Sequence, residues 1–138
     1  MSVKVNCAIV CDSVRQEING KLIFVGVYTG DIVVQRYPVD ISLQVWLEIQ
    51  PEFTGHSEDF NVRIRLGPDE DVVLGELGAT MEKENAELPI GASHISLPSI
   101  SFHIQRSSDF IVEIRAGEED WVQVLKKKII RQSDIDDL

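Results

Sequence analysis

Hydrophobic and polar residues alternate along much of the chain with a period of two. The clearest stripes are the odd-numbered positions from Ile41 to Ile49 and the even-numbered positions from Phe60 to Leu66, each set against polar neighbours. This period is typical of a strand that buries one face, because successive side chains point to opposite sides of a sheet. The pattern therefore predicts two strands here. It also predicts that four apolar side chains lie in the core: Val45, Leu47, Ile64 and Val112.

The N-terminal part of the chain shows the same alternation. The odd-numbered residues from Val3 to Cys11 are expected to face the core, and Asp12-Ser13 is expected to end that strand. Asn19-Gly20 then predicts a β-hairpin with a type I′ turn, since both residues tolerate positive φ angles. The run from Leu22 to Tyr28 is apolar at both its odd-numbered and its even-numbered positions, which favours a central strand covered on both faces. Within it, Gly26 marks a bulge or a close approach of the backbone.

Turn residues interrupt the rest of the chain at short intervals. We expect about eight to ten short strands and hence an all-β fold, an antiparallel two-sheet sandwich, with a closed barrel as the alternative. Residues 1–132 form a single domain in this interpretation, and the acidic tail 133–138 frays. The polar stretch 82–92 is compatible with a helical turn or an irregular crossover, and the sequence leaves its conformation open.

Composition and charge narrow the function classes. Valine and isoleucine contribute 16 residues each to a chain of 138, and β-branched side chains favour strands. Lys and Arg number 13 against 23 Asp and Glu, so the net charge is −10. Nucleic acids and anionic membranes are therefore not expected as partners. The N-terminus does not resemble an export signal and no apolar run is long enough to span a membrane, which predicts a cytoplasmic location.

Few residues have the spacing of a catalytic or metal site. His56, His94 and His103 form no i,i+2 or i,i+4 pair, the spacing that places two metal ligands on one face. Cys7 and Cys11 lie too far apart on one strand to form a disulfide, and they are expected to be buried free thiols. Acidic pairs fall in predicted turns, where solvated carboxylates are the expectation and a weak calcium site is the alternative. The sequence thus predicts no enzyme, no metal and no cofactor.

Three segments carry a resemblance to a known family: Cys11-Asp12, Asn19-Gly20-Lys21-Leu22 and Val25-Gly26-Val27-Tyr28. They resemble the opening of a family of small bacterial proteins classified only as a domain of unknown function. The resemblance implies an immunoglobulin-like β-sandwich, and the segments Phe110–Arg115 and Trp121–Lys128 are compatible with the end of such a sandwich. It implies no substrate and no catalytic residue.

Trp46 is the residue that most suggests a binding surface. Its neighbours at alternate positions, Gln44 and Glu48 among them, are polar, so a large indole is expected on the solvent side of the sheet. If this strand forms a hairpin with the next one, the register places Arg63 or Arg65 opposite Trp46. The arginine either covers the indole as a cation–π partner or joins it as an anchor for a binding partner.

Lys126-Lys127-Lys128, followed by Arg131, is the basic cluster of this acidic chain. Lysines on a terminal edge strand oppose pairing with the edge of another protein, and this is the simpler interpretation. The alternative is a docking patch for an acidic partner.

The predicted function is that of a non-enzymatic protein-interaction or assembly module, whose partner is another protein or a second copy of the chain. One alternative is a small-molecule or carbohydrate binder that uses the exposed Trp46 face with a second coplanar aromatic ring, such as Tyr37 or Trp121. Another is a hydrolase with an unrecognised site, which requires two histidines beside a carboxylate. The candidate interaction face consists of Gln44, Trp46, Glu48, Arg63 and Arg65.

Overall fold

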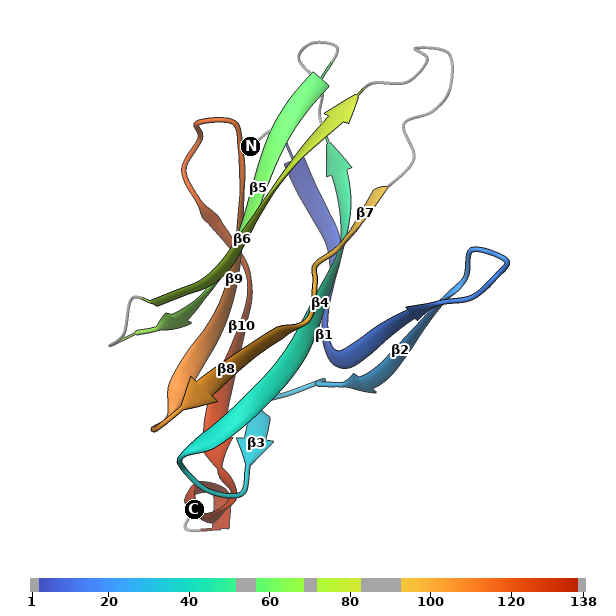
Figure 1. The fold of residues 1–138 in the computed structure, drawn as a ribbon. Helices are drawn as coiled ribbons and strands as arrows, with labels where there is room; N and C mark the ends of the chain where they lie inside the picture. Colours follow the sequence, from blue (N-terminus) through green and yellow to red (C-terminus); the bar gives the residue numbers. More distant parts are fainter. Residues whose placement is uncertain (1–2, 52–56, 69–71, 83–92, 137–138) are drawn as a thin grey trace.

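Two β-sheets face each other and enclose the core in a computed structural model of the chain (Figure 1). The structure describes residues 3–51, 57–68, 72–82 and 93–136. The first sheet is formed by β1 (Val3–Gln16), β2 (Leu22–Val27), β4 (Val39–Pro51), β7 (Ser93–Ser96) and β8 (Ile100–Ile104). The second is formed by β3 (Ile32–Val34), β5 (Ser57–Gly67), β6 (Val72–Glu82), β9 (Ser108–Ala116) and β10 (Val122–Arg131). The predicted all-β sandwich is confirmed, with ten strands in the described part of the chain.

The core is formed by the alternating stripes that the sequence predicts. Val45 and Leu47 on β4 and Ile64 on β5 are buried, as is Val112 on β9. On β4 and β5 the intervening residues point away from the other sheet and are more exposed, whereas the intervening residues Ile111 and Glu113 of β9 are buried as well. Burial of these branched side chains from both sheets stabilises the sandwich.

The neighbours of the two most regular strands differ from the prediction. β4 pairs with β1, β7 and β8, whereas β5 pairs with β6 and β9, so the two strands lie in different sheets. The predicted hairpin between 41–50 and 60–66 is therefore wrong. An alternating pattern shows which face of a strand is buried, and that face is equally well covered by a strand across the core. Residues 52–56 of the predicted hairpin loop lie outside the described residues.

β1 is longer and less regular than expected. It continues through Asp12 and Ser13, which the sequence predicts as a turn. Its register to β4 shifts between Val5 and Cys7, and this bulge reverses the alternation. Cys7 is therefore only half-buried, which corrects its predicted place in the core, whereas Cys11 is fully buried. Both are free cysteines.

The predicted hairpin at Asn19-Gly20 joins β1 to β2, but its turn is of another type. The N–H of Gly20 donates to the carbonyl of Glu17 at 3.1 Å, and the N–H of Glu17 donates to the carbonyl of Lys21 at 2.8 Å. Gly20 has a φ of 83°. These bonds define a three-residue loop in which a type I turn is followed by a left-handed glycine, in place of a type I′ turn.

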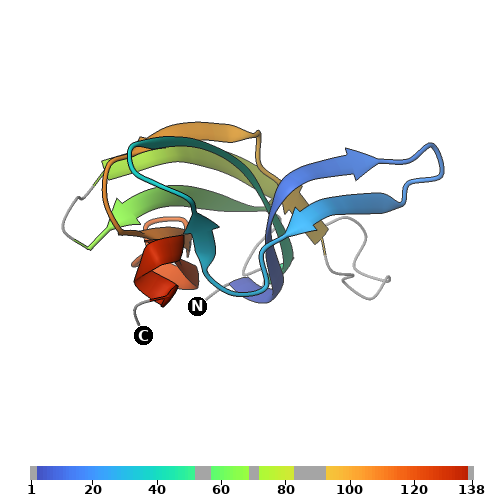
Figure 2. The same cartoon turned by 90° about the horizontal axis from the view of Figure 1, so that it is seen from below.

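β2 is an edge strand and not the predicted central strand. With the distal half of β1 it forms an arm that projects from the body of the sandwich (Figure 2). A strand that is apolar at both odd and even positions is therefore exposed at a sheet edge here.

The last described segment of the chain combines a parallel strand pair with a short helix. β10 runs parallel to β3 over Ile129–Arg131 and is followed by the short helix α1 (Gln132–Asp136). Arg131 forms an ion pair with Asp134 at 3.1 Å. β3 pairs only with Ile129–Arg131 of β10, so among the described residues Lys126–Lys128 pair with β9 alone and lie at an edge of the sheet, as predicted. Among the described residues no helix is long and apolar enough to cross a membrane.

Candidate functional site

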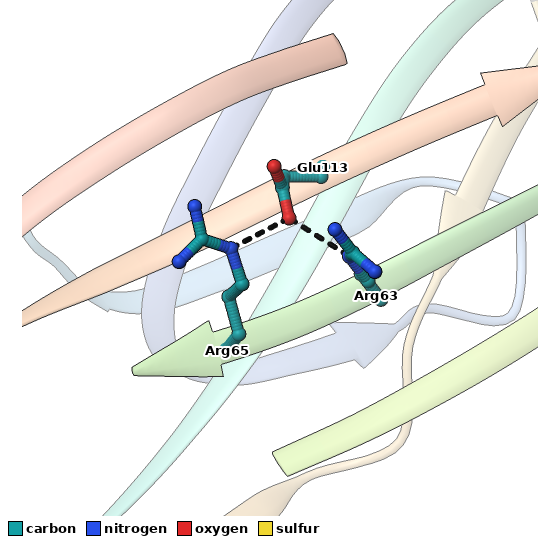
Figure 3. A network of polar contacts seen from close by, with 3 residues as sticks. All are labelled: Arg63, Arg65 and Glu113. Atoms are coloured by element: carbon teal, nitrogen blue, oxygen red, sulfur yellow. Dashed lines mark hydrogen bonds and ion pairs between the residues drawn. The ribbon is translucent and has the colours of Figure 1, made fainter. Parts of the chain in front are cut away.

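Arg63 and Arg65 lie on the outer face of the second sheet and share one carboxylate. They are two residues apart on β5, so their side chains point to the same side, and Arg63 is the cross-strand partner of Glu113 on β9. The Nε–H groups of both arginines donate to Oε1 of Glu113, each at 2.8 Å (Figure 3). In the figure, the terminal nitrogens of Arg65 lie on the side of the guanidinium away from Glu113.

The two arginines keep Glu113 ionised although it is buried. Its residue is 7% exposed. Burial on its own raises the pKa of Glu113, but the hydrogen bonds and charges of Arg65 and Arg63 outweigh burial and hold the pKa below its ordinary value. The cluster of two guanidinium groups and one carboxylate therefore carries a net positive charge at neutral pH.

Trp121 completes this surface. The guanidinium carbon of Arg63 lies 4.2 Å from the centre of the Trp121 ring, and that of Arg115 lies 4.6 Å from it. Both distances fall within the range of cation–π attraction. The turn after β9 places the indole there, because Gly117, with a φ of 55°, reverses the chain just before β10. We call the set Arg63, Arg65, Glu113, Arg115 and Trp121 the arginine–tryptophan face.

β10 extends the positive charge beyond the arginine–tryptophan face. Cross-strand pairing aligns Arg65 and Lys126 on either side of Ile111, and it aligns Lys128 with Asp109. Residues directly paired across strands point to the same side of the sheet. Nζ of Lys126 lies 3.6 Å from the Asp109 carboxylate. Lys126 and Lys128 thus adjoin the arginines, as a docking patch requires, whereas Lys127 pairs with the buried Phe110 and points to the opposite side of the sheet.

Arg115 has a buried nitrogen whose hydrogen-bonding capacity is unused. Among the described residues, Nε of Arg115 has no exposed surface and no hydrogen-bond partner. A buried donor without a partner destabilises the folded chain by about 1 to 3 kcal/mol. The guanidinium of Arg115 is therefore positioned by its packing against Trp121 and not by a hydrogen bond at Nε.

The predicted interaction face is divided between the two sheets. Gln44, Trp46 and Glu48 lie on β4 of the first sheet, whereas Arg63 and Arg65 lie on β5 of the second. An arginine opposite Trp46 is therefore a wrong prediction. The error follows directly from the predicted β4–β5 hairpin, because that hairpin alone brought the two sets of residues together.

Trp46 is instead packed by aromatic rings. The Phe24 ring lies edge-on with its centre 5.1 Å from that of Trp46, and the His94 ring stacks at 6.0 Å. Trp46 is half-buried, and its Nε1 has no hydrogen-bond partner among the described residues. The side chain of Gln44 beside it accepts from the Val14 N–H at 2.9 Å and donates to the Leu97 carbonyl at 3.0 Å, so it holds strands together.

The contacts of Trp46, Trp121, Tyr37 and the histidines give less support to the carbohydrate-binder and hydrolase alternatives. Neither aromatic ring proposed to join Trp46 in sugar binding is stacked beside it, because Trp121 lies between arginines and Tyr37 lies 5.7 Å from the guanidinium of Arg131. His103 lies 2.8 Å from the exposed carboxylate of Asp40, which provides one histidine–carboxylate pair.

The hydrolase alternative requires a second histidine at that carboxylate, but His94 is stacked on Trp46. His56 lies outside the described residues. Over residues 3–51, 57–68, 72–82 and 93–136, no three His, Cys, Asp or Glu side chains are grouped as metal ligands.

The fold and this surface define a class of protein: an acidic β-sandwich with a cationic, aromatic outer face on one of its sheets. Residues 6–124 match a family described as "Family of unknown function (DUF6941)". The chain belongs to this family, which confirms the resemblance inferred from Cys11-Asp12 and the two segments after it. A search of curated proteins finds no match.

Proposed function

We propose that this chain is a non-enzymatic protein-interaction module that binds an acidic segment of a partner protein through the arginine–tryptophan face. The observation that carries the proposal is the position of Trp121 between Arg63 and Arg115. Tryptophan and arginine are the residues most enriched among those that dominate binding energies. Here they are brought together on a regular sheet, which holds them in a fixed arrangement.

Charge supports an acidic partner. Glu113 is the one acidic member of the arginine–tryptophan face, against three arginines. Lys126 and Lys128 lie on the same side of the sheet, where Asp109 pairs with Lys126 and Glu76 is the cross-strand partner of Arg63. Guanidinium groups bind carboxylates with two parallel hydrogen bonds, so a glutamate or aspartate side chain suits their terminal nitrogens. The chain as a whole carries a charge of −10 and repels an acidic partner elsewhere, which favours contact at this face.

Two free cysteines support the cytoplasmic location that we propose with this function. Free thiols persist in reducing compartments, whereas exported domains of this size more often use disulfides. The resemblance to small bacterial proteins supports a bacterial cell as the setting. Cell fractionation of the tagged chain, with markers for each compartment, tests the location, and recovery with the secreted or membrane fraction would contradict it.

A labelled acidic peptide tests the binding function. We expect the anisotropy of a fluorescent peptide of alternating glutamate and aspartate to rise with added protein, and a lysine peptide of equal length to give no rise. Trp121→Ala should weaken binding by about 30-fold or more, the effect of truncating a dominant interface residue. Trp46→Ala is the matched control, because it removes the other tryptophan from the opposite sheet, and it should bind normally.

The controls make the proposal falsifiable. Equal binding by wild type and Trp121→Ala would contradict it, as would equal binding of the acidic and basic peptides. Loss of binding only in Trp46→Ala would show that the binding site lies on the first sheet. Binding should weaken as sodium chloride rises from about 50 to about 500 mM, because salt screens the charges of such a contact.

A further inference from the structure

The two arginines bound to Glu113 keep most of their hydrogen-bonding capacity. A guanidinium carries five N–H donors, one on Nε and four on the two terminal nitrogens. Arg63 and Arg65 each use Nε for the same oxygen of Glu113 (Figure 3), and among the described residues neither forms an ion pair with another acidic side chain. Their side chains are 26% and 24% exposed. The edge of each guanidinium that carries the two terminal nitrogens can therefore bind a carboxylate of another molecule.

Both guanidinium groups are held in place from more than one side. Glu113 binds the Nε of each, and Arg63 also packs against Trp121, with its guanidinium carbon 4.2 Å from the ring centre. A terminal nitrogen of Arg65 lies 3.1 Å from the position that a Cβ would occupy at Gly67, so the glycine leaves room for this guanidinium. Side chains that are already ordered lose less freedom when a partner binds, which favours binding.

The arginines repeat at the spacing of an extended chain. Positions 63 and 65 are alternate residues of β5, so their side chains leave the same side of the sheet and their Cα atoms lie about 6.6 Å apart. Lys126 and Lys128 repeat this spacing on β10, on the same side of the sheet. An extended peptide also projects alternate side chains to one side at this distance. The cations of this surface therefore match alternate positions of an extended segment.

We propose that the acidic segment bound by the arginine–tryptophan face is extended and carries two acidic side chains separated by one residue, and that Glu113 is the positioning residue for both contacts. This inference rests on the proposed function, because it specifies which acidic segments the face selects. One carboxylate of the partner binds the terminal nitrogens of Arg63 and the other binds those of Arg65, each with two parallel hydrogen bonds. The side chain between them points away from the sheet.

Other arrangements of acidic residues fit the two arginines less well. Adjacent residues of an extended segment point to opposite sides, so only one of two neighbouring acidic side chains reaches the sheet. A helix brings residues at i and i+4 to one face, but two like charges at that spacing destabilise the helix. The face therefore distinguishes acidic segments of equal charge by the spacing of their carboxylates.

The effect of Glu113 on charge opposes its effect on geometry. Its carboxylate repels an acidic partner, whereas its hydrogen bonds orient both arginines toward that partner. Glu76 on β6 separates the two effects, because it is exposed and is also a cross-strand partner of Arg63. Within the described part of the chain, the ion pair of Arg63 is with Glu113 and not with Glu76. Glu76→Gln and Glu113→Gln thus change the charge equally, but only Glu113→Gln releases the guanidinium groups.

Two fluorescent peptides of equal length and composition test the spacing. Each contains six glutamates and six serines, which alternate singly in one peptide and in pairs in the other, so only the first has glutamates separated by one residue. Anisotropy should show that wild type binds the singly alternating peptide about 10-fold more tightly. Glu76→Gln, the matched control, should bind both peptides more tightly and keep this ratio. Glu113→Gln should bind both peptides equally, because its arginines lose their fixed orientation.

Arg65→Lys tests the same geometry without removing Glu113. It keeps the positive charge but cannot form two parallel hydrogen bonds with one carboxylate, so it should also lose the preference. Circular dichroism shows that each variant is folded, and a preference that persists in a folded Glu113→Gln or in Arg65→Lys would contradict the assigned geometry.

The outcomes separate this inference from the proposed function on which it rests. Equal binding of the two peptides by wild type would overturn the inference, and the proposed function would still stand if Trp121→Ala weakened the binding of both. Tighter binding of the peptide with paired glutamates would also overturn it, and would indicate a helical partner. Binding of neither peptide would contradict the proposed function as well.

Discussion

Arg63 and Arg115 approach Trp121 together, with guanidinium carbons 4.2 and 4.6 Å from the centre of its ring. The two arginines come from neighbouring strands, β5 and β9, and the indole comes from the residue just before β10. A single side chain thus connects three strands of the second sheet on its outer face. This arrangement makes Trp121 a residue that contributes both to the stability of the sheet and to the surface that it presents.

Trp121→Ala should lower the free energy of unfolding by about 1 to 2 kcal/mol, since each cation–π contact at a partly exposed site contributes about 0.5 to 1 kcal/mol. Urea unfolding followed by circular dichroism measures the change. Trp121→Phe keeps an aromatic ring and should recover part of the loss. Unchanged stability in the alanine variant would show that the arginines hold their positions without the indole.

Glu113→Gln should destabilise the chain at neutral pH by about 3 kcal/mol, because it leaves two partly buried guanidinium groups without their anion. The pKa of Glu113 is lower in the folded chain than its ordinary value of 4.5. Its stabilising contribution is therefore present above pH 4.5 and is lost as the pH falls through the lower folded pKa.

The difference in unfolding free energy between wild type and Glu113→Gln should shrink accordingly as the pH falls from 4.5 through the lower folded pKa of Glu113, because the carboxylate of the wild type is then protonated. Urea titrations at about pH 7, 4.5 and 3 measure this difference. Glu118→Gln, in the exposed turn after β9, is the matched control and should follow wild type at each pH. A difference that stays constant from pH 7 to pH 3 contradicts the assigned role.

The two cysteines should differ in reactivity. Cys11 is fully buried, and burial raises the pKa of its thiol. Cys7 is half-buried and lines an open groove with Val124 and Leu125 of β10. Because the thiolate is the reactive species and must be accessible, iodoacetamide should modify Cys7 first and Cys11 only after denaturant is added. Mass spectrometry locates each adduct. The Cys7→Ser variant should resist modification in its native state, and early labelling of Cys11 would contradict its burial.

The period of two was enough to predict the core, but not the neighbours of each strand. Ile64 and Val45 are buried as predicted, since a buried face needs only a regular alternation. Whether β5 lies beside β4 or across the core from it depends on pairing between distant segments, which the alternation of a single strand does not specify. The bulge near Cys7 has no evident signal in the sequence either. The residues of β1 that follow the bulge were therefore assigned to the wrong faces of the sheet.

The arginine–tryptophan face shares Arg63 and Arg65 with the interaction face predicted from the sequence, but its other members were not predicted. Pairing of tryptophan with arginine does occur, but at Trp121 and not at Trp46. A usable signal was present, because Arg115 and Trp121 flank the predicted turn at 117–120, and residues that flank a hairpin turn lie near each other. Glu113 gave no such signal, since its burial depends on two arginines of another strand.

Gly26→Ala should disturb the base of the arm through two separate effects. At a φ of 68° an alanine is strained by about 1 to 2 kcal/mol, and its Cβ would also displace the Asp12 side chain. Gly20→Ala is the matched control, because Gly20 has a φ of 83° but its Cβ would meet nothing within 4 Å. Urea unfolding should therefore show a larger loss for Gly26→Ala than for Gly20→Ala.

A tyrosine titration separates these two effects. Burial and the hydrogen bond to Asp12 raise the pKa of Tyr28 to about 12. If alanine at position 26 pushes the Asp12 carboxylate away, that pKa should fall toward the ordinary value of 10, whereas Gly20→Ala should leave it raised. Tyr37→Phe removes the other tyrosine, so ultraviolet absorbance reports Tyr28 alone. Equal losses of stability and an unchanged Tyr28 titration in both variants would show that backbone strain alone acts at position 26. The position of the Asp12 carboxylate would then not depend on the absence of a side chain at Gly26.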